Sequence, residues 1–383
     1  MTSPRAFRFA TATEIRFGRG ESARAVPDLA ALGASALLVI GGTPSRSDWL
    51  AQALEDQDVQ VTKFAVQGEP DVALVEAGVR AARAAKVASV IALGGGAVID
   101  AGKAIAALTP TMRPMSDHLE VVGKGLPLGQ APLPFAALPT TSGTGAEVTR
   151  NAVIAVPDAA RKVSLRDPAM LPRLAIVDPA LTDGCPRAVT LASGLDAITQ
   201  VIEPYICTRA NPMTDALCRD AIPRGLRALV ALMNGEDRDA RDEMSWASLS
   251  GGLALANAGL GVIHGLAGPL GGLSSAAHGA ICGALLPFGL AANAARLSDN
   301  EAAHRIGEIR NWIADALGST EADAFAALAA WSRDQGLLGL DAQGVTADHR
   351  AQAAKDAATS SSMRANPVSL TEADLAQIME QAR

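Results

Sequence analysis

One continuous stretch decides the fold of the first half of the chain: Val87-Ala88-Ser89-Val90-Ile91-Ala92-Leu93-Gly94-Gly95-Gly96-Ala97-Val98-Ile99-Asp100-Ala101-Gly102-Lys103. It begins with an apolar run, which is typical of a parallel strand buried on both faces. The glycines that follow let backbone N–H groups approach an anion, and the helix expected next presents its positive end to the same point. Gly94, Gly95 and Gly96 therefore have two interpretations, a phosphate-binding loop or a tight turn.

Working outward from this stretch, the chain alternates between strand and helix patterns. Strands are predicted at residues 36–40, 59–64, 132–138, 151–155 and 174–177, and helices after Gly20, through Leu50 to Leu54, and at residues 72–85. Residues 6–17 alternate apolar and polar side chains, as a short hairpin does. Strand followed by helix, repeated, predicts an open, doubly wound α/β domain with a mostly parallel sheet.

The pattern changes near residue 180. Beyond it helical periodicity dominates and no segment predicts a strand. A chain of 383 residues, 49% of them hydrophobic, is long enough for two cores. We therefore predict an α/β domain at residues 1–180 and an all-helical domain at residues 181–383.

A second loop rich in donors follows the strand predicted at residues 132–138. It supplies Thr140, Thr141, Ser142 and Thr144, whose hydroxyl groups suit phosphate and ribose oxygens. A solvated turn is the alternative interpretation. Two such loops after strands indicate a nucleotide, and the absence of a Walker lysine-serine pair favours a dinucleotide over ATP chemistry.

The helical half contains a candidate metal site. Asp196 and Gln200 are four residues apart on a predicted helix and so share one face, and His264 and His278 are two of only five histidines in the sequence. One carboxylate and two imidazoles suit zinc or iron(II). The alternative is a buried histidine that hydrogen-bonds a carbonyl, and the neutral amide of Gln200 is a weak ligand.

Composition limits the partners and the compartment. The net charge of −7 argues against nucleic acid and against anionic membrane surfaces as partners. The first seven residues lack the apolar run of a signal peptide, and we expect no segment that spans a membrane. The four scattered cysteines are expected to be reduced and buried, so the prediction is a cytoplasmic protein.

Read together, the motifs resemble the iron-containing (group III) alcohol dehydrogenase family. They occur in the family's order from about residue 8 to the end: Gly94-Gly95-Gly96 with Asp100 and Lys103, Pro139-Thr140-Thr141 with Gly143-Thr144-Gly145 and Glu147, Asp178-Pro179, Gly194 with Asp196-Ala197 and Glu203, Asn211-Pro212 with Thr214-Asp215, His264, His278-Gly279, and Ser362-Met363 with Asn366-Pro367. The resemblance implies a dehydroquinate-synthase-like architecture, in which a divalent metal lies between a dinucleotide-binding domain and a helical domain.

The resemblance also assigns roles to residues. The pyrophosphate loop is expected at Gly94, Gly95 and Gly96 with Asp100 as its anchoring carboxylate, and further cofactor contacts at Thr140, Thr141, Ser142 and Thr144. Lys162 is expected near the nicotinamide ribose. Asp196, His264 and His278 match metal ligands of the family, and the metal is iron or zinc.

Two positions depart from the family. Gln200 stands where the fourth ligand is normally histidine, and Gly268 stands where a further histidine lies near the substrate. An amide is a poorer donor than imidazole, so the site binds metal, binds it weakly or works without it. Without the second histidine, water or a cofactor ribose hydroxyl becomes the expected route for the proton.

The loop after the second strand bears on cofactor choice. NAD-preferring relatives place an Asp there, whereas this chain has Gly41, Gly42 and Thr43, followed by Ser45 and Arg46. Without the carboxylate, a 2′-phosphate meets less repulsion, which favours NADP and leaves NAD as the alternative. Arg46 has a second interpretation, as a solvated residue at a helix start.

The predicted activity is metal-assisted hydride transfer between NAD(P)(H) and a small alcohol, aldehyde or ketone, by a homodimer or higher homo-oligomer. Asp196, His264, His278 and Lys162 are its candidate catalytic residues. The alternatives are a metal-free dehydrogenase of the same fold, an NAD-dependent lyase of the dehydroquinate-synthase type, and an inert nucleotide-binding protein.

Overall fold

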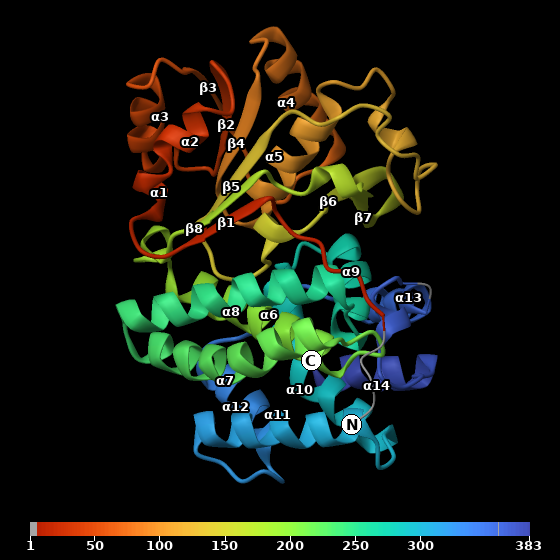
Figure 1. Ribbon diagram of the computed structural model, residues 1–383. Helices are drawn as coiled ribbons and strands as arrows, with labels where there is room; N and C mark the ends of the chain where they lie inside the picture. The colour runs from red at the N-terminus through yellow and green to blue at the C-terminus, as the bar shows by residue number, and fades with distance from the viewer. Residues whose placement is uncertain (1–5, 359) are drawn as a thin grey trace. The chain divides into compact units, whose positions relative to one another are not determined.

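The computed structural model describes residues 6–358 and 360–383, which form two compact units (Figure 1). The α/β unit consists of Thr11–Thr141 and Gly145–Asp183, and the helical unit contains residues 6–10, Ser142–Thr144 and the chain from Gly184 onward. Residues 1–5, on which the expectation about a signal peptide partly rests, lie outside the described part. An α/β half followed by a helical half is the fold class that the sequence predicts, and it is confirmed.

The α/β unit is built on a six-stranded parallel sheet. In spatial order its strands are β1 (Glu14–Phe17), β8 (Leu174–Val177), β5 (Phe135–Pro139), β4 (Ser89–Gly94), β2 (Ser35–Ile40) and β3 (Gln60–Ala65). From β2 the chain moves outward to β3 and then returns to β4 on the other side of β2. The order therefore reverses between β2 and β4, which is where open α/β sheets bind ligands.

Helices cover both faces of this sheet, as Figure 1 shows. One face carries α1 (Glu21–Arg24), α2 (Val26–Ala30) and α3 (Asp48–Glu55), and the other carries α4 (Val72–Ala84) and α5 (Gly96–Leu108). Along β2, Leu38 joins the core under α2 and α3, whereas Leu37 and Val39 join the core under α4 and α5. Burial on both faces explains why this strand is a continuous apolar run.

Three predictions for the α/β unit were wrong in detail. Residues 6–17 form no hairpin, because only β1 is a strand and it pairs in parallel with β8, Glu14 opposite Leu174. Alternation shows that a strand has two unlike faces, but it does not identify the partner strand. The helix expected after Gly20 is split at Ala25 into α1 and α2. A strand was also missed: the charged β7 (Arg161–Arg166) pairs antiparallel with β6 (Asn151–Val156).

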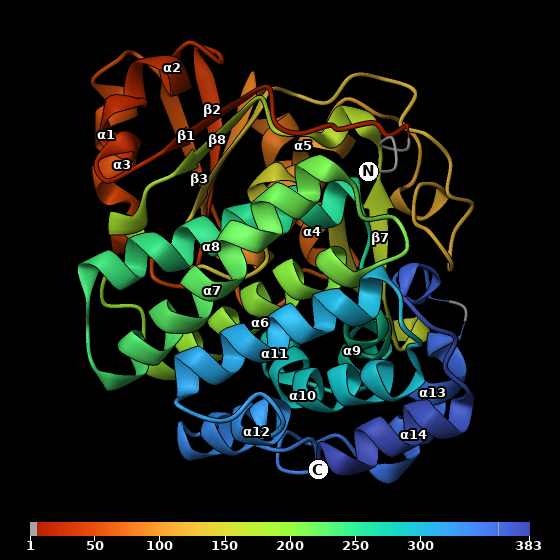
Figure 2. The same cartoon turned by 60° about the horizontal axis from the view of Figure 1, so that its bottom comes forward.

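The helical unit contains no strand among its described residues, as predicted. Its helices are α6 (Arg187–Ile206), α7 (Pro212–Asn234), α8 (Arg238–Asn257), α9 (Val262–Leu273), α10 (His278–Arg296), α11 (Glu301–Leu317), α12 (Ala324–Asp334), α13 (Ala347–Ala357) and α14 (Glu372–Gln381). α6 contacts α7, α8 and α10, and α10 also contacts α9, α12 and α14 (Figure 2). The two helices α6 and α10 therefore share one core of mainly Ala, Leu, Ile and Val side chains.

One helix departs from the expectation that no segment reaches the length and hydropathy of a membrane span. Among the described residues α10, 19 residues long, does so by length and composition, and α8 with α9 would do so as one bent pair. Over half of the apolar window of α10 is buried inside the protein, as in the core helix of a soluble fold. The absence of a membrane partner stays a prediction.

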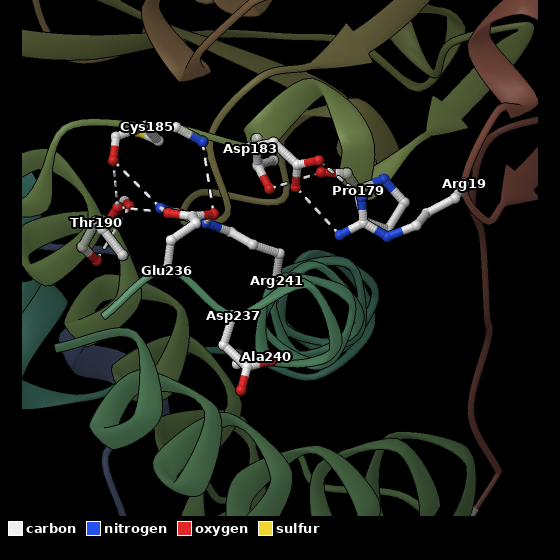
Figure 3. A network of polar contacts seen from close by, with 12 residues as sticks. Arg19, Pro179, Asp183, Cys185, Thr190, Glu236, Asp237, Ala240 and Arg241 are labelled. Carbon is white, nitrogen blue, oxygen red and sulfur yellow. Dashed lines mark hydrogen bonds and ion pairs between the residues drawn. The ribbon is translucent and has the colours of Figure 1, made fainter. Parts of the chain in front are cut away.

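Polar networks fix the two chain segments on either side of residue 184 (Figure 3). In the α/β unit Arg19 makes a two-pronged ion pair with Asp183, at 2.8 and 3.1 Å. In the helical unit the buried Arg241 of α8 donates to Glu236 at 2.7 Å and to the Thr190 hydroxyl at 2.9 Å. Each network therefore stabilises its own unit next to residue 184, where the chain passes from the α/β unit to the helical unit.

The cysteines are free, as predicted. Cys207, Cys218 and Cys282 are buried, but Cys185 is half-exposed, so the prediction of burial was wrong for that residue. The carbonyl of Cys185 accepts a hydrogen bond from Arg241 at 3.2 Å. The contact uses the backbone carbonyl, so it does not depend on the thiol.

Candidate functional site

Three helices of the helical unit bring four potential ligands together. Asp196 comes from α6, His264 from α9, and His278 and Cys282 from α10, and one ligand atom of each lies within 4.8 Å of all the others. His264 Nε2 is 3.5 Å and His278 Nε2 is 3.9 Å from Asp196 Oδ1. The structure therefore places the three predicted ligands side by side and adds Cys282, which the sequence analysis did not select.

Two atoms at the centre of this cluster are buried without a hydrogen-bond partner, Asp196 Oδ1 and His264 Nε2. Their residues are only 2% and 8% exposed. His264 Nδ1 lies 2.7 Å from Glu203 Oε2 and donates its proton there, so Nε2 is left with a lone pair that faces the carboxylate oxygen. Two facing acceptors need a proton or a metal cation between them, and a carboxylate with two imidazoles fits a divalent metal.

The pKa values of the cluster agree with that requirement. Burial alone would lower the pKa of His264, but Asp196 and Glu203 raise it to about 10. Burial would raise the pKa of Asp196, yet His264, His278 and Cys282 hold it below its usual value. Without a metal the imidazole keeps a proton, so in either state a positive charge compensates the carboxylates.

Glu203 orients the cluster from α6. It lies seven residues after Asp196 and so on the same helix face. Its Oε1 accepts a hydrogen bond from the Ile263 N–H at 2.6 Å, so the carboxylate sits at the positive start of α9 while Oε2 fixes the His264 ring. A carboxylate behind a ligating histidine is the usual arrangement in metal sites. The sequence analysis quoted Glu203 in a motif but gave it no role.

Glycines allow the helices to approach this closely. A Cβ added at Gly261 would lie 2.9 Å from Glu203 Oε1, and one added at Gly279 would lie 2.4 Å from the Ala192 carbonyl oxygen. Any larger residue there would separate α9 or α10 from α6. The motif residue Gly279, next to His278, is therefore explained by packing.

The two departures from the family have different surroundings. Gln200, 3% exposed, donates from Nε2 to the Thr144 carbonyl at 2.7 Å, and since a carbonyl only accepts, the amide nitrogen must be the group that faces it. Apart from Gly268, its chain neighbours and the nearby backbone of its own helix, no heavy atom of the described residues lies within 4 Å of a Cβ added at Gly268. The helix thus leaves open space at the position where the family has a further histidine.

The loops predicted to bind a dinucleotide meet at one edge of the α/β sheet. Gly41, Gly95 and Thr140 each follow the carboxyl end of a strand, and β4 lies between β2 and β5. The Thr140 N–H donates to the Gly94 carbonyl at 3.0 Å, and a Cβ added at Gly95 would lie 3.2 Å from Thr141 Oγ1. The glycine loop and the threonine loop therefore touch between β4 and β5, next to the position between β2 and β4 where strand order reverses.

The start of α5 faces this edge. Gly95 is its N-cap, and no side chain caps the helix. Gly42, Thr43 and Ser45 lie in the exposed segment after β2, next to the same crossover. Free N–H groups at a helix start favour an anion such as a pyrophosphate. Ser142 and Thr144 belong to the helical unit, where the Ser142 hydroxyl lies 3.0 Å from that of Ser245.

Asp100 holds the backbone behind the glycine loop. Its Oδ2 accepts from the Val153 N–H at 3.0 Å, and burial raises its pKa to about 6. The buried Lys103 donates to the Ala146 carbonyl, the Thr149 hydroxyl and the Asn151 carbonyl at 2.7, 2.9 and 2.7 Å. Burial lowers the pKa of Lys103 to about 8. Both side chains therefore fix β6 and the loop before it.

Lys162, expected near the nicotinamide ribose, lies on β7. Its Nζ is 3.6 Å from Glu69 Oε2, and its side chain is 10% exposed. On β7, Lys162 pairs across the two-stranded sheet with Ala155 of β6. Its position near the nicotinamide ribose and its catalytic role stay predictions.

This fold and these residues point to a class: a protein with an α/β unit suited to a dinucleotide and a helical unit with a group that could hold a metal ion. Comparison with known families agrees. Residues 12–179 match the model described as iron-containing alcohol dehydrogenase, and residues 190–383 match the C-terminal model of the Fe-containing alcohol dehydrogenase family. The chain belongs to the iron-containing alcohol dehydrogenase family.

Individual relatives point the same way. The chain is 36% identical to alcohol dehydrogenase 4 of Schizosaccharomyces pombe over 243 residues, which cover 62% of this chain and a little over half, 56%, of that protein. It is 30% identical to the NAD-dependent methanol dehydrogenase of Bacillus methanolicus over 95% of this chain and 97% of the relative. A crystal structure of 1,3-propanediol oxidoreductase superposes with a TM-score of 0.89 at 29% identity, over 99% of this chain and all of that one. These relatives are oxidoreductases, which does not favour the lyase alternative.

Proposed function

We propose that this protein transfers a hydride between a nicotinamide dinucleotide and a small alcohol, aldehyde or ketone, with a divalent metal at the Asp196 cluster. The observation that carries the proposal is the pair of buried, facing acceptors, Asp196 Oδ1 and His264 Nε2, 3.5 Å apart beside His278. The names of the relatives, a methanol dehydrogenase and a propanediol oxidoreductase, support small alcohols as the substrate class.

Asp196, His264 and His278 are the residues that would hold the metal. When bound there, a divalent metal would supply Lewis acidity, which lowers the pKa of an alcohol substrate. Glu203 keeps the proton of His264 on Nδ1, so that Nε2 remains a donor to the metal. The nicotinamide provides the hydride chemistry, and the protein provides binding and orientation.

The α/β unit would bind the cofactor. The N–H groups at the start of α5 and the glycine loop suit the pyrophosphate, and the hydroxyls of Thr140 and Thr141 suit phosphate or ribose oxygens. Lys162 would lie toward the nicotinamide ribose. Because Gly268 supplies no imidazole, the proton of the alcohol leaves through water or a cofactor ribose hydroxyl.

The segment after β2 favours NADP. Residues 41–47 contain no carboxylate, and the first acid beyond them, Asp48, is paired with Lys63 at 2.6 Å. A 2′-phosphate would therefore meet the hydroxyls of Thr43 and Ser45 and the exposed guanidinium of Arg46, and residues 41–47 add no carboxylate of their own. NAD is the alternative, and the methanol dehydrogenase relative is NAD-dependent by name.

Replacing Arg46 tests this choice of cofactor. Arg46→Ala is expected to raise KM for NADPH by about 10-fold, the equivalent of one charge-assisted hydrogen bond, and to leave KM for NADH unchanged. Steady-state kinetics with both cofactors measure this, with Arg24→Ala, another exposed arginine of the α/β unit, as the control. Equal KM values for NADPH in Arg46→Ala and the parent would contradict the preference.

The activity itself is tested by elemental analysis of the purified protein together with NADPH- and NADH-linked reduction of a short aliphatic aldehyde. We expect near-stoichiometric divalent metal, loss of turnover on chelation and recovery when the metal is added back. Full turnover without metal would replace the proposal with a metal-free dehydrogenase. Cofactor binding without turnover of any alcohol, aldehyde or ketone would leave an inert nucleotide-binding protein.

We also propose a cytoplasmic homodimer or higher homo-oligomer. Four free cysteines with no disulfide support a reducing compartment. Light scattering on the eluting protein from a sizing column gives the mass in solution, and a monomer at all concentrations would contradict the assembly. Fractionation of cells with an antibody to the native protein tests the compartment.

A further inference from the structure

We propose that Cys282 is the fourth protein ligand of this metal site, in place of Gln200, and that its thiolate biases the site toward zinc. The inference rests on the metal site of the proposed function and goes beyond it. It adds a ligand that the family resemblance does not supply, because the fourth ligand of the family is a histidine at position 200. The resulting ligand set is one carboxylate, two imidazoles and one thiolate.

The first argument is position. Cys282 lies four residues after His278 on α10, so both side chains project from the same helix face. Its sulfur lies 3.6 Å from His278 Nε2 and within 4.8 Å of a carboxylate oxygen of Asp196. A buried cysteine that only fills space packs against carbon atoms. This one is turned toward the two polar groups that would bind the ion.

The second argument is the size of the cluster. Ligand atoms that bind one zinc ion at about 2.0–2.3 Å with tetrahedral angles lie roughly 3.3–3.8 Å from one another. The edges measured here are 3.5 Å between His264 and Asp196, 3.9 Å between His278 and Asp196, and 3.6 Å between His278 and Cys282. Three of the six separations are therefore close to those of one four-coordinate site, and all four ligand atoms lie within 4.8 Å of one another.

The third argument is the weakness of Gln200 as a metal ligand. Its amide nitrogen donates to the Thr144 carbonyl at 2.7 Å, so the neutral Oε1 is the one atom that it could offer to a metal. A neutral amide oxygen is also a weak ligand beside a thiolate. The donor that the family takes from α6 at position 200 is therefore supplied from α10, by a residue that reaches the same centre.

The change of ligand alters charge and metal preference. When Cys282 binds, its thiol proton leaves to solvent, and the thiolate and the Asp196 carboxylate together neutralise a divalent ion. Thiolate with imidazole is a soft set that selects zinc, whereas iron(II) is suited by imidazole with carboxylate. We therefore expect zinc to bind more tightly than iron(II), in contrast to the family's name.

Cobalt(II) substitution tests the ligand directly. The metal-free protein is titrated with Co²⁺, and the parent is expected to show a near-ultraviolet sulfur-to-cobalt charge-transfer band besides the visible bands of a four- or five-coordinate ion. Cys282→Ser should lose the charge-transfer band while the visible bands persist, weakened or shifted. Cys218→Ser, at another fully buried cysteine, and Gln200→Ala should both keep the band.

The outcomes separate this inference from the proposed function. A parent that binds cobalt without a charge-transfer band, or a band that survives in Cys282→Ser, overturns the thiolate ligand even if aldehyde reduction is intact. Loss of the band in Gln200→Ala with retention in Cys282→Ser would do the same. Should Cys282→Ser fail to fold, judged by circular dichroism, Cys282→Asp provides the second variant, which keeps an anionic ligand but removes sulfur and so must lack the band.

Discussion

At the scale of single residues, Glu203 links the architecture of the helical unit to its chemistry. Its carboxylate accepts the His264 Nδ1 proton at 2.7 Å and the Ile263 N–H at 2.6 Å. Glu203→Gln keeps the shape but removes the charge, and we expect metal affinity to fall about 10- to 100-fold, the usual cost of losing such a partner. Competition titration of zinc against a chromophoric chelator measures this.

Glu301→Gln is the control for that experiment. Glu301 is a mostly exposed residue of α11 that pairs with Arg305, so the variant removes one negative charge from the same unit. Its zinc affinity should match the parent. If Glu203→Gln also matched the parent, the second carboxylate would have no part in holding the ligand.

The site residues show how far sequence reasoning reaches. Asp196, His264 and His278 were predicted from their types and from the motif order, and the structure places them together. Cys282 was not selected, although its spacing of four from His278 on a predicted helix was a usable signal. Spacing gives the face of one helix, but not which faces of α6, α9 and α10 meet, and that required tertiary packing.

At the scale of elements, Asp178 joins the end of β8 to the start of α1. One carboxylate oxygen accepts from the Gly20 N–H, the Ser22 N–H and the Ser22 hydroxyl at 3.1, 3.1 and 2.5 Å, and the other accepts from the Ala180 N–H at 3.0 Å. Asp178→Ala leaves several of these donors buried without an acceptor. We expect the free energy of unfolding to drop by about 3 kcal/mol.

Urea unfolding followed by circular dichroism measures that loss. Asp183→Ala is the matched control, because Asp183 lies in the same segment and pairs with Arg19 near the surface (Figure 3). A solvent-accessible ion pair, here with side chains 21% and 36% exposed, contributes about 1 kcal/mol, so this variant should lose less stability than Asp178→Ala. An equal decrease in the free energy of unfolding of the two variants would mean that the buried hydrogen bonds of Asp178 stabilise the fold no more than the Asp183 ion pair does.

Elements with strong patterns were predicted well, and the others were not. The apolar runs gave β2, β4, β5 and β8 to within a few residues, because strands buried on both faces leave a continuous signal. β7 carries Arg161, Lys162 and Arg166 on one short strand, which masks any alternation. The partner of β1 is about 160 residues away along the chain, and a local pattern holds no information on it.

At the scale of the whole molecule, the two units have separate cores. The composition of the chain changes once, near residue 180, but the chain passes between the units more than once. The helical unit includes Ser142–Thr144, a short excursion from the α/β half. Contacts such as the one between the hydroxyls of Ser142 and Ser245 assign it there. The sequence predicted a single boundary near residue 180, because composition changes once, whereas contacts decide where a short loop belongs.

The stability of the whole protein should depend on pH through Glu147. Burial raises the pKa of Glu147 from its ordinary value of 4.5 to about 7 in the folded state, against the opposing charge of Lys103. Between these two values the folded protein keeps a proton that the unfolded chain releases, so the free energy of unfolding falls as pH rises. The stability that the protonated Glu147 contributes is fully present below its pKa in the unfolded chain. It is lost as the pH rises through its pKa in the folded protein.

Glu147→Gln removes the titration and keeps the side chain's shape. The free energy of unfolding of the variant minus that of the parent should rise by roughly 1 to 3 kcal/mol between about pH 5 and about pH 8. This is the free energy that corresponds to a raised pKa of one buried carboxyl group. Urea unfolding at both pH values measures the difference, and comparing the two proteins cancels every carboxyl they share. Because Lys103 keeps its three hydrogen bonds in the variant, a constant difference across this range would mean that Glu147 stays ionised in the fold, its charge balanced by Lys103.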